Sequence, residues 1–348
     1  MNLALHLSPP WPSPPPGSAG PVARLTWCAA VARWAPSKHN TQPWSFVVRE
    51  DALEIWADPQ RMLPESDPHR RELVLSCGAA VQLACVAARA LGVQPEVTLL
   101  PDGGGSLLAR VVEAGPWATS EQDRHLLQSV ARRRTDRGPL DADALPPSTP
   151  FLLQSAAERE GASLRLVAIP GERATLARLV ERADRLLVRS GGVDHELQSW
   201  LREPGDHRRD GVQTDLTRGA AASYRAEFVQ RDFSGASGSR ALHDRAGADH
   251  PILGILCTPG DLERDWLLAG RALAAVLLCA AEVGADSSYL NQPVEEPTIR
   301  TELQTQFALV GSAQVVLRLG VGGAVPRTVR RRPSEVTSWA AGPGGSPR

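Results

Sequence analysis

The segment with the most specific chemistry is a polar loop at residues 35–46, which reads APSKHNTQPWSF. Its side chains are mostly small and polar, so backbone N–H groups stay accessible and the Asn40 amide can both donate and accept hydrogen bonds. The edge of a planar heterocycle such as a flavin requires such groups, with no bulky side chain over its face. The same residues also fit an ordinary turn in which Ser37 and Asn40 cap a helix end and Trp44 begins a core strand.

Two arginine clusters lie far from this loop in the sequence. Residues 132–137 read RRRTDR, and residues 330–334 read RRRPS. Forked guanidinium donors beside a hydroxyl are what a phosphate monoester needs for charge-assisted hydrogen bonds. Taken singly, either cluster also fits a solvated helix end or a tail.

Taken together, these segments resemble the nitroreductase-like flavoproteins. The loop resembles their P-S-x-x-N-x-Q-P-W motif, and HNTQPW at residues 39–44 looks like the version in the Acg-type branch. The first arginine cluster resembles the family's R-R-S/T-x-R phosphate-binding segment, and residues 330–336 are similar to its C-terminal basic pair. The resemblance spans about residues 22 to 336 and departs from the family in an insertion at residues 202–249.

The resemblance implies an FMN site whose parts come from two subunits, because in the family one subunit supplies the arginines and the other the loop. Carried over to this sequence, the ring contacts are Pro36, Ser37, Lys38 and Asn40. The phosphate contacts are Arg133, Arg134, Thr135, Arg330, Arg331 and Arg332. Backbone contacts near the flavin N5 fall on Leu290, Asn291 and Gln292. Arg137 is expected near the ribityl chain, and it or Lys38, the only lysine, could stabilise an anionic hydroquinone at N1–O2.

Hydrophobic periodicity predicts the elements that must position these residues. In the first part we expect helices at 22–34 and 72–91, strands at 44–48 and 53–57, and strands near 97 and 111. Ser120, three residues before Asp123, is typical of a helix start. Beyond it we expect helices at 151–160, 176–187, 195–201 and 261–283, with strands at 164–169, 252–257 and 315–319.

An internal duplication is suggested by the two long helices. Gly78 and Gly92 have the same spacing as Gly270 and Gly284, and both helices lead to strands. The first part carries the polar loop without an arginine motif before it, and the second carries the arginines without the loop. Complementary losses of this kind imply one complete site between the two halves of a single chain.

We therefore expect an α+β protein of the nitroreductase-like fold, an internally duplicated pseudo-dimer with mixed, mostly antiparallel sheets wrapped by helices. The expected parts are a disordered Pro-rich extension (1–20), a first half (21–117), a second half (118–336) with a lid at about 202–250, and a flexible tail (337–348). The chain could be a monomer, because the pseudo-dimer makes a second subunit redundant.

Composition excludes several classes of function. The net charge of -1 gives no positive field to attract nucleic acid or an anionic membrane surface. The longest strictly apolar run, residues 272–281, is far short of the roughly 20 residues of a membrane helix. Five cysteines in apolar stretches fit buried free thiols in a reducing cytoplasm, and no histidine or cysteine spacing is typical of a metal site.

The expected function is FMN-dependent hydride transfer to a nitroaromatic or quinone-like acceptor, with NAD(P)H as donor. FMN carries this chemistry, so no residue is assigned a catalytic role of its own. The alternative is a protein that sequesters or senses FMN, in which the insertion closes over the ring so that no nicotinamide can stack. The sequence does not separate the two.

Overall fold

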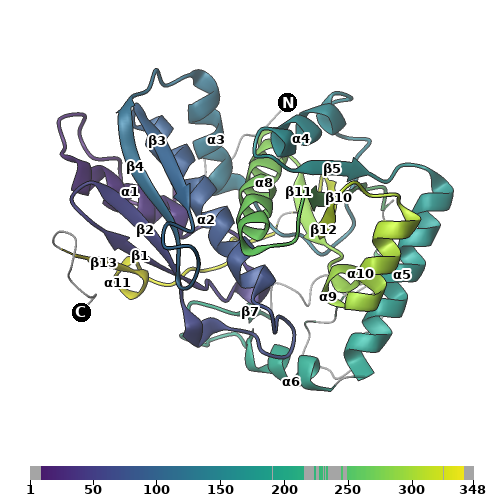
Figure 1. The fold of residues 1–348 in the computed structure, drawn as a ribbon. Helices are drawn as coiled ribbons and strands as arrows, with labels where there is room; N and C mark the ends of the chain where they lie inside the picture. Colours follow the sequence, from purple (N-terminus) through teal and green to yellow (C-terminus); the bar gives the residue numbers. More distant parts are fainter. Residues whose placement is uncertain are drawn as a thin grey trace.

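The computed structural model describes residues 9–189, 191–214, 223–224, 227–229, 231, 233, 244–245, 249–323 and 325–340. Two sheets lie on opposite sides of a central pair of helices, α2 (Arg71–Ala90) and α8 (Glu263–Glu282) (Figure 1). Helix α2 is buried from Arg71 to Ala88, and α8 is mostly buried after its first turn.

The two sheets share one topology. The first has the order β13-β1-β2-β4-β3 and the second β11-β12-β10-β5. The first sheet is built from β1 (Trp44–Val48), β2 (Ala52–Ala57), β3 (Val93–Leu99), β4 (Leu107–Pro116) and β13 (Thr337–Trp339). The second is built from β5 (Ser163–Leu166), β10 (Ile252–Thr258), β11 (Asp286–Tyr289) and β12 (Ser312–Gly320). Read from β5, the second sheet has the order β5-β10-β12-β11, which corresponds strand by strand to β1-β2-β4-β3. All neighbouring pairs within these two sets of four strands are antiparallel. In each set the long helix, α2 or α8, follows the second strand along the chain.

The remaining elements surround these layers. The helices are α1 (Pro21–Ala32), α3 (Glu121–Arg132), α4 (Thr149–Glu158), α5 (Pro170–Arg189), α6 (Gly192–Ser199), α9 (Gln292–Glu295), α10 (Pro297–Gln306) and α11 (Pro333–Val336). Short 3-10 turns are η1 (Lys38–Asn40) and η2 (Pro59–Arg61). Within the insertion, β6 (Leu201–Arg202) pairs with β7 (Val212–Gln213), and β8 (Ser223–Tyr224) with β9 (Asp244–Arg245). The mixed, mostly antiparallel α+β architecture confirms the predicted fold class.

The crossing of α2 and α8 is reciprocal. A Cβ atom on Gly270 would lie 1.9 Å from the Leu75 carbonyl oxygen, and one on Gly78 would lie 2.2 Å from that of Leu267. Each glycine thus faces the residue three positions before the other, as at an isologous interface between two like helices. The two glycines at this crossing are the pair that the sequence comparison of the long helices aligns.

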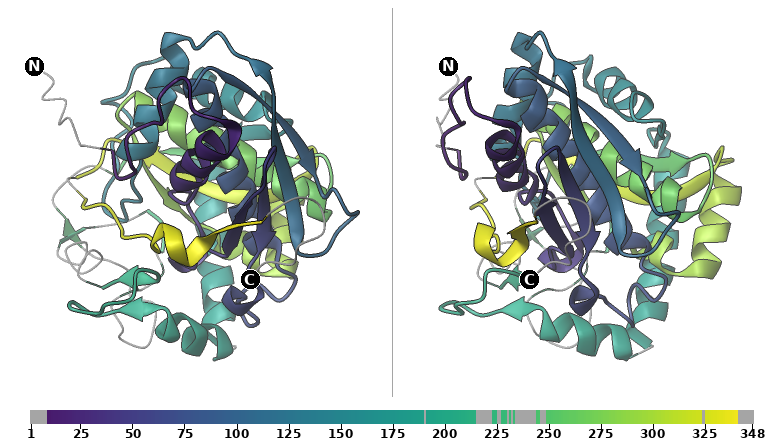
Figure 2. Two further views of the ribbon diagram at one scale, coloured as in Figure 1. Left: turned by 90° about the vertical axis from the view of Figure 1, so that its left-hand side faces the viewer. Right: turned by 60° about the vertical axis from the view of Figure 1, so that its left-hand side comes forward.

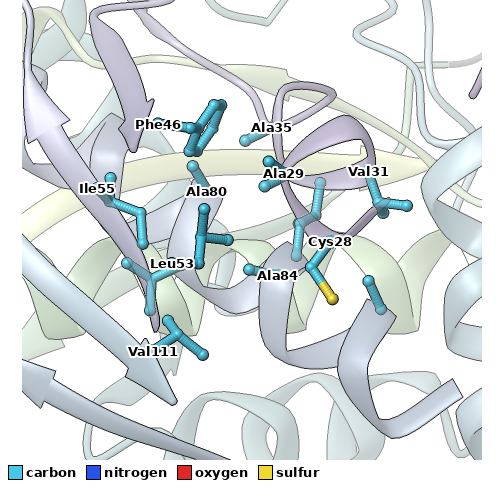
Figure 3. Packing of buried hydrophobic residues seen from close by; sticks show 14 of the residues in the cluster. Cys28, Ala29, Val31, Ala35, Phe46, Leu53, Ile55, Ala80, Ala84 and Val111 are labelled. Atoms are coloured by element: carbon cyan, nitrogen blue, oxygen red, sulfur yellow. The ribbon is translucent and has the colours of Figure 1, made fainter. Parts of the chain in front are cut away.

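The core of the first half lies between its sheet and its helices (Figure 3). Cys28 and Val31 of α1, Phe46 of β1, Ile55 of β2 and Ala84 of α2 are all buried in one apolar cluster. Side chains of α8 also belong to this cluster, so the helix pair joins the cores of the two halves.

At the start of the second half, the Ser120 hydroxyl accepts from the Asp123 N–H (3.1 Å) and the Asp123 carboxylate accepts from the Ser120 N–H (2.8 Å), which confirms the predicted start of α3.

Both termini differ from the expected extension and tail where the structure describes them. Trp11 is only 8% exposed, and the Trp27 indole donates to the Pro12 carbonyl oxygen at 2.9 Å, so this part of the extension packs on α1. At the other end, Thr337–Trp339 forms β13 because the outer edge of β1 offers unpaired backbone groups. Figure 2 shows this C-terminal segment lying against the first half. Residues 1–8 and 341–348 lie outside the described residues.

The structure describes the surroundings of the cysteines, of helix α2 and of possible metal ligands. All five cysteines are free and buried. Helix α2 has the length and mean hydropathy (1.7) of a membrane span, but 89% of that window is buried inside the protein. Such burial is typical of the central helix of a folded core. Among the described residues, no group of three or more His, Cys, Asp or Glu side chains could hold a metal ion.

Candidate active site

A cavity with an empty volume of about 1270 Å³, part of it open to solvent, lies between the two halves. It receives residues from the polar loop, α2, the segment after α3, the insertion, α8, β11, α9, β12 and the C-terminal segment. The lining residues are Pro36, Ser37, Lys38, His39, Asn40, Glu72, Leu75, Ser76, Arg133, Thr135, Arg137, Gly211, Val212, Gln213, Arg231, Phe233, Leu273, Ser288, Tyr289, Asn291, Gln292, Glu295, Val315, Thr328 and Arg330.

The polar loop is held in a strained backbone conformation at this cavity. His39, Asn40 and Gln42 have φ angles of 48°, 54° and 52°, in the left-handed region that few residues other than glycine adopt. The loop is fixed from within, because the Gln42 N–H donates to the Ser37 hydroxyl at 2.9 Å. It is also fixed from the C-terminal segment, where the Arg331 N–H donates to the Gln42 side-chain oxygen at 2.7 Å. Strain that surrounding contacts enforce is a property of binding sites.

Two side chains of the loop bring unused polar atoms to the cavity wall. The Asn40 amide nitrogen donates to the Gly211 carbonyl oxygen at 3.0 Å, while its Oδ1 has no partner among the described residues. His39 is 8% exposed, and its Nε2 likewise has no partner among them. Burial, reinforced by the charges of Lys38 and Arg231, holds the pKa of His39 well below its ordinary value. The imidazole is therefore neutral at pH 7.

Lys38 lies in a buried network of ion pairs. Its ammonium group contacts Glu72, lies 3.2 Å from Glu295 and donates to the Ser66 carbonyl oxygen at 2.8 Å. Arg231, from the insertion, pairs with the same Glu295 at 2.6 Å. Burial by itself lowers the pKa of Lys38, but the two carboxylates outweigh it and raise that pKa. Lys38 is charged, and its charge is neutralised by protein carboxylates.

The arginine-rich end of the cavity is different because, among the described residues, no carboxylate forms an ion pair with Arg133 or Arg330. Arg133 is 9% exposed, and its Nε and Nη1 have no hydrogen-bond partner among the described residues. Arg330 is 3% exposed; it donates to the Thr328 hydroxyl at 2.7 Å and to the Ala35 carbonyl oxygen at 3.2 Å. Burial, followed by the charges of Arg133 and Arg33, holds the pKa of Arg330 well below its ordinary value. An anion placed here would remove this electrostatic penalty.

Local backbone pairing positions the first arginine cluster. Arg133 caps the end of α3, and its N–H donates to the Ser129 carbonyl oxygen at 2.8 Å. Thr135 then bridges to Ser287 of β11 in parallel, and the Asp136 N–H donates to the Ser287 carbonyl oxygen at 2.8 Å. The segment is thus added to the edge of the second sheet.

The middle of the cavity has apolar walls. Leu75 of α2, Leu273 of α8 and Val315 of β12 are all buried and line it. From the insertion, the Phe233 ring lies 4.3 Å from the Arg137 guanidinium carbon and 6.1 Å, edge to face, from the His39 ring. An apolar middle with polar ends suits a planar ring that carries an anionic tail.

Comparison of the amino-acid sequence with known proteins finds relatives that are named nitroreductases. The Mycobacterium tuberculosis protein named "Putative NAD(P)H nitroreductase Rv3131" is 30% identical over 314 residues, which cover 88% of this chain and 88% of the relative. This chain belongs to the nitroreductase family. The protein named "Putative NAD(P)H nitroreductase acg", from the same organism, is 26% identical over 310 residues that cover 87% of this chain and 91% of the relative. This nitroreductase-family chain is thus also similar to an Acg protein, the branch that the loop motif resembles.

Two further comparisons add detail without changing this assignment. No family model matches the chain. Among solved structures, a nitroreductase with bound FMN from Bacteroides fragilis is 15% identical, covers 57% of this chain and 88% of its own, and has a TM-score of 0.31.

The structure of this nitroreductase-family chain brings most of the predicted site residues to one cavity. From the loop these are Pro36, Ser37, Lys38 and Asn40. From the second half they are Arg133, Thr135, Arg137, Asn291, Gln292 and Arg330. The two sets belong to different halves of one chain, as the complementary losses in the sequence imply.

Four predicted residues do not line this cavity. Leu290 is buried in the apolar core, and its N–H already donates to the Val316 carbonyl oxygen at 2.9 Å. The Arg331 guanidinium turns away to the Gln42 carbonyl oxygen at 3.2 Å, because neighbours in an extended segment point to opposite sides. Arg332 caps α11. Arg134 donates to the last carbonyl oxygens of α3 and lines a neighbouring, smaller cavity.

Sequence reasoning missed several lining residues. Glu72 and Glu295 are separated by more than 200 positions and meet only through the packing of α2 against the second half. Arg231 and Phe233 lie in the insertion, whose composition predicted a lid without naming its contacts. His39 is the exception, since it stands inside the motif that the sequence singled out. Residues 215–222, 225–226, 230, 232, 234–243 and 246–248 of the insertion lie outside the described residues.

Proposed function

We propose that this chain binds FMN between its halves and acts as an NAD(P)H-dependent reductase of nitroaromatic or quinone-like acceptors. When bound, FMN supplies the hydride-transfer chemistry at its N5 atom. The chain's own residues bind, orient and tune it. NAD(P)H as donor and the class of acceptor follow from the names of the relatives and from the family resemblance.

The observation that carries the proposal is the pair of buried arginines, Arg133 and Arg330, at one end of the cavity, whose Nε groups have no hydrogen-bond partner in the part of the chain that the structure describes. A buried guanidinium without an acceptor is costly, and a phosphate oxygen satisfies it by a charge-assisted hydrogen bond. The Thr135 and Thr328 hydroxyls line the same end and can donate to the same group. This donor set fits the phosphate of FMN.

The flavin ring would lie against the apolar walls formed by Leu75, Leu273 and Val315. The Asn40 Oδ1, which has no partner among the described residues, can accept from a ring N–H. Lys38, which pairs with Glu72 and Glu295, and Arg137 both line the cavity and are the candidates for the cation near N1–O2.

The test is to load the protein with FMN and to reduce it with NADH, NADPH and dithionite in parallel, following flavin bleaching. Bleaching by NADH or NADPH, followed by reoxidation with a nitroaromatic or a quinone, would support the reductase. A protein that retains no FMN after gel filtration would contradict the whole proposal.

A second function is favoured by the insertion. Phe233 stacks on Arg137, and Arg231 enters the buried ion-pair network, so the insertion lies against the cavity. A flavin covered in this way would be sequestered from nicotinamide. In that case dithionite would bleach the flavin while NADH and NADPH would not. The Phe233→Ala variant should then restore bleaching by NAD(P)H, whereas an unchanged variant would count against occlusion by this residue.

A further inference from the structure

A second, smaller cavity adjoins the phosphate end of the proposed FMN site. It has an empty volume of about 310 Å³, part of it open to solvent, and shares Arg133, Thr135, Thr328 and Arg330 with the larger cavity. Its other lining residues are Trp34, Val130, Arg134, Pro326 and Arg327. Arg133 and Arg330 therefore form a shared wall between the two cavities, and the other side chains around the small cavity do not line the larger one.

The polar atoms left unpaired around this small cavity are all donors. Among the described residues, the Trp34 Nε1, the Arg327 Nε and the Arg330 Nε have no hydrogen-bond partner. Trp34 is only 8% exposed, so water does not readily satisfy its indole N–H. None of the described residues that line the cavity is acidic. Buried donors without acceptors indicate a missing acceptor, because each costs free energy while unpaired.

Positive charge is concentrated around Trp34. The guanidinium carbons of Arg33, Arg327 and Arg330 lie 5.3, 5.5 and 5.5 Å from its ring centroid. Carbonyl oxygens hold these groups in place: Arg327 donates to Ala131 at 3.0 Å, and Arg134 donates to the same oxygen at 2.8 Å. Dipoles of carbonyl groups orient the guanidiniums but do not cancel their charge. The ring faces of Trp34 relieve only part of the repulsion.

The negative charge of one phosphate does not neutralise the positive charge of these arginines. A phosphate monoester carries about -1.5 to -2 charges at pH 7. Arg133 and Arg330, on the shared wall, would use that charge, whereas Arg134 and Arg327 do not line the larger cavity. Burial, followed by the charges of Arg327 and Arg133, lowers the pKa of Arg134 to about 10.

We infer that this small cavity is a second oxyanion site, which binds a tetrahedral, phosphate-type anion next to the FMN phosphate. Arg327, Arg134 and the Trp34 indole would donate from the outer side, and Arg133 and Arg330 from the shared wall. The anion could be free inorganic phosphate or the second phosphate of a dinucleotide flavin. The inference rests on the proposed function only in assigning the first phosphate position to FMN.

The experiment is a calorimetric titration of inorganic phosphate into FMN-loaded protein, in buffer free of phosphate and sulfate and at constant ionic strength. We expect one phosphate to bind per chain. Arg327→Gln should weaken its binding by about tenfold or more, because a charge-assisted hydrogen bond is lost. Arg132→Gln, which changes an exposed arginine at the end of α3, serves as the matched control and should bind like the wild type.

Two results would overturn the inference. One is the absence of phosphate binding to FMN-loaded wild-type protein. The other is a loss of FMN affinity in Arg327→Gln, with riboflavin unaffected, as large as that in Arg133→Ala, because Arg327 would then belong to the FMN phosphate site. The flavin absorbance of the protein shows beforehand whether FMN has bound. If none has, titration of inorganic phosphate into the flavin-free wild type and Arg327→Gln proteins still tests the role of Arg327.

The source of the anion is read from a third titration, with FAD. Tighter binding of FAD than of FMN, together with loss of phosphate binding in the FAD-loaded protein, identifies the diphosphate of the dinucleotide as the occupant. Simultaneous binding of FMN and inorganic phosphate, with FAD no tighter than FMN, identifies free phosphate. Either pattern supports a second oxyanion site.

Discussion

At the residue scale, Arg133 has the most direct role in the proposed site, because it is buried and two of its nitrogens have no partner among the described residues. Arg133→Ala should weaken FMN binding roughly tenfold to 150-fold, the equivalent of about 1.5 to 3 kcal/mol for a charge-assisted hydrogen bond. Riboflavin, which lacks the phosphate, should bind the wild type poorly and be nearly indifferent to the change. Arg132→Ala is the control, and equal losses for both ligands would make Arg133 structural.

Asp286 gives a second prediction at this scale. Burial, followed by repulsion from Asp136, raises the pKa of Asp286 to about 6. A carboxyl whose pKa is higher in the folded state favours folding when protonated, so its ionisation destabilises the protein as pH rises through about 6. Asp286→Asn should therefore raise the thermal midpoint at pH 7.5, with a much smaller gain at pH 4.5. Thermal denaturation at both pH values measures this, and a gain that is equal at both would rule out titration of Asp286 as the cause.

At the element scale, the crossing of α2 and α8 depends on two glycines. Gly270→Ala would place a Cβ atom 1.9 Å from a backbone oxygen of α2, which cannot move without separating the helices. Overpacking of this kind costs about 1 to 3 kcal/mol or more. Gly171→Ala, at a position where nothing lies within 4 Å of the new Cβ atom, is the control and should be close to neutral. Denaturant unfolding compares the two, and equal stabilities would mean that the crossing is loose.

At the scale of the whole molecule, the halves share a strand order but contribute different parts to one cavity. We therefore predict one FMN for each chain of 348 residues. Flavin released on denaturation, measured against protein concentration, should give a ratio near one at saturation. A saturated ratio near two would contradict a single site shared by the halves.

The same arrangement predicts the result of mixing damaged chains. Asn40→Ala/Lys38→Ala protein alters the first half, and Arg133→Ala/Thr135→Ala protein alters the second. Because the loop and the arginines of one chain line one cavity, a mixture of the two should not regain tight FMN binding. Wild-type affinity in a fraction of sites after joint refolding would show that chains exchange halves.

The sequence by itself determined the local features. Strand β1 begins and ends where alternation predicts, and Ser120 and Asp123 form the predicted cap of α3, because such signals arise between residues close in the chain. The loop and the first arginine cluster were also recognisable, since phosphate and ring chemistry demands particular residue types at short spacings. Ten of the fourteen site residues that the family resemblance implies line the cavity.

Only the tertiary structure decided which side chains the cavity receives from distant segments. Glu72, Glu295 and Arg231 meet around Lys38 because α2, α9 and the insertion pack together, and no local pattern encodes that meeting. The tertiary structure also places Leu290 in the core and directs the Arg331 guanidinium away from the cavity. It pairs Thr337–Trp339 with β1. Side-chain direction and strand pairing depend on long-range register, which a single sequence does not specify.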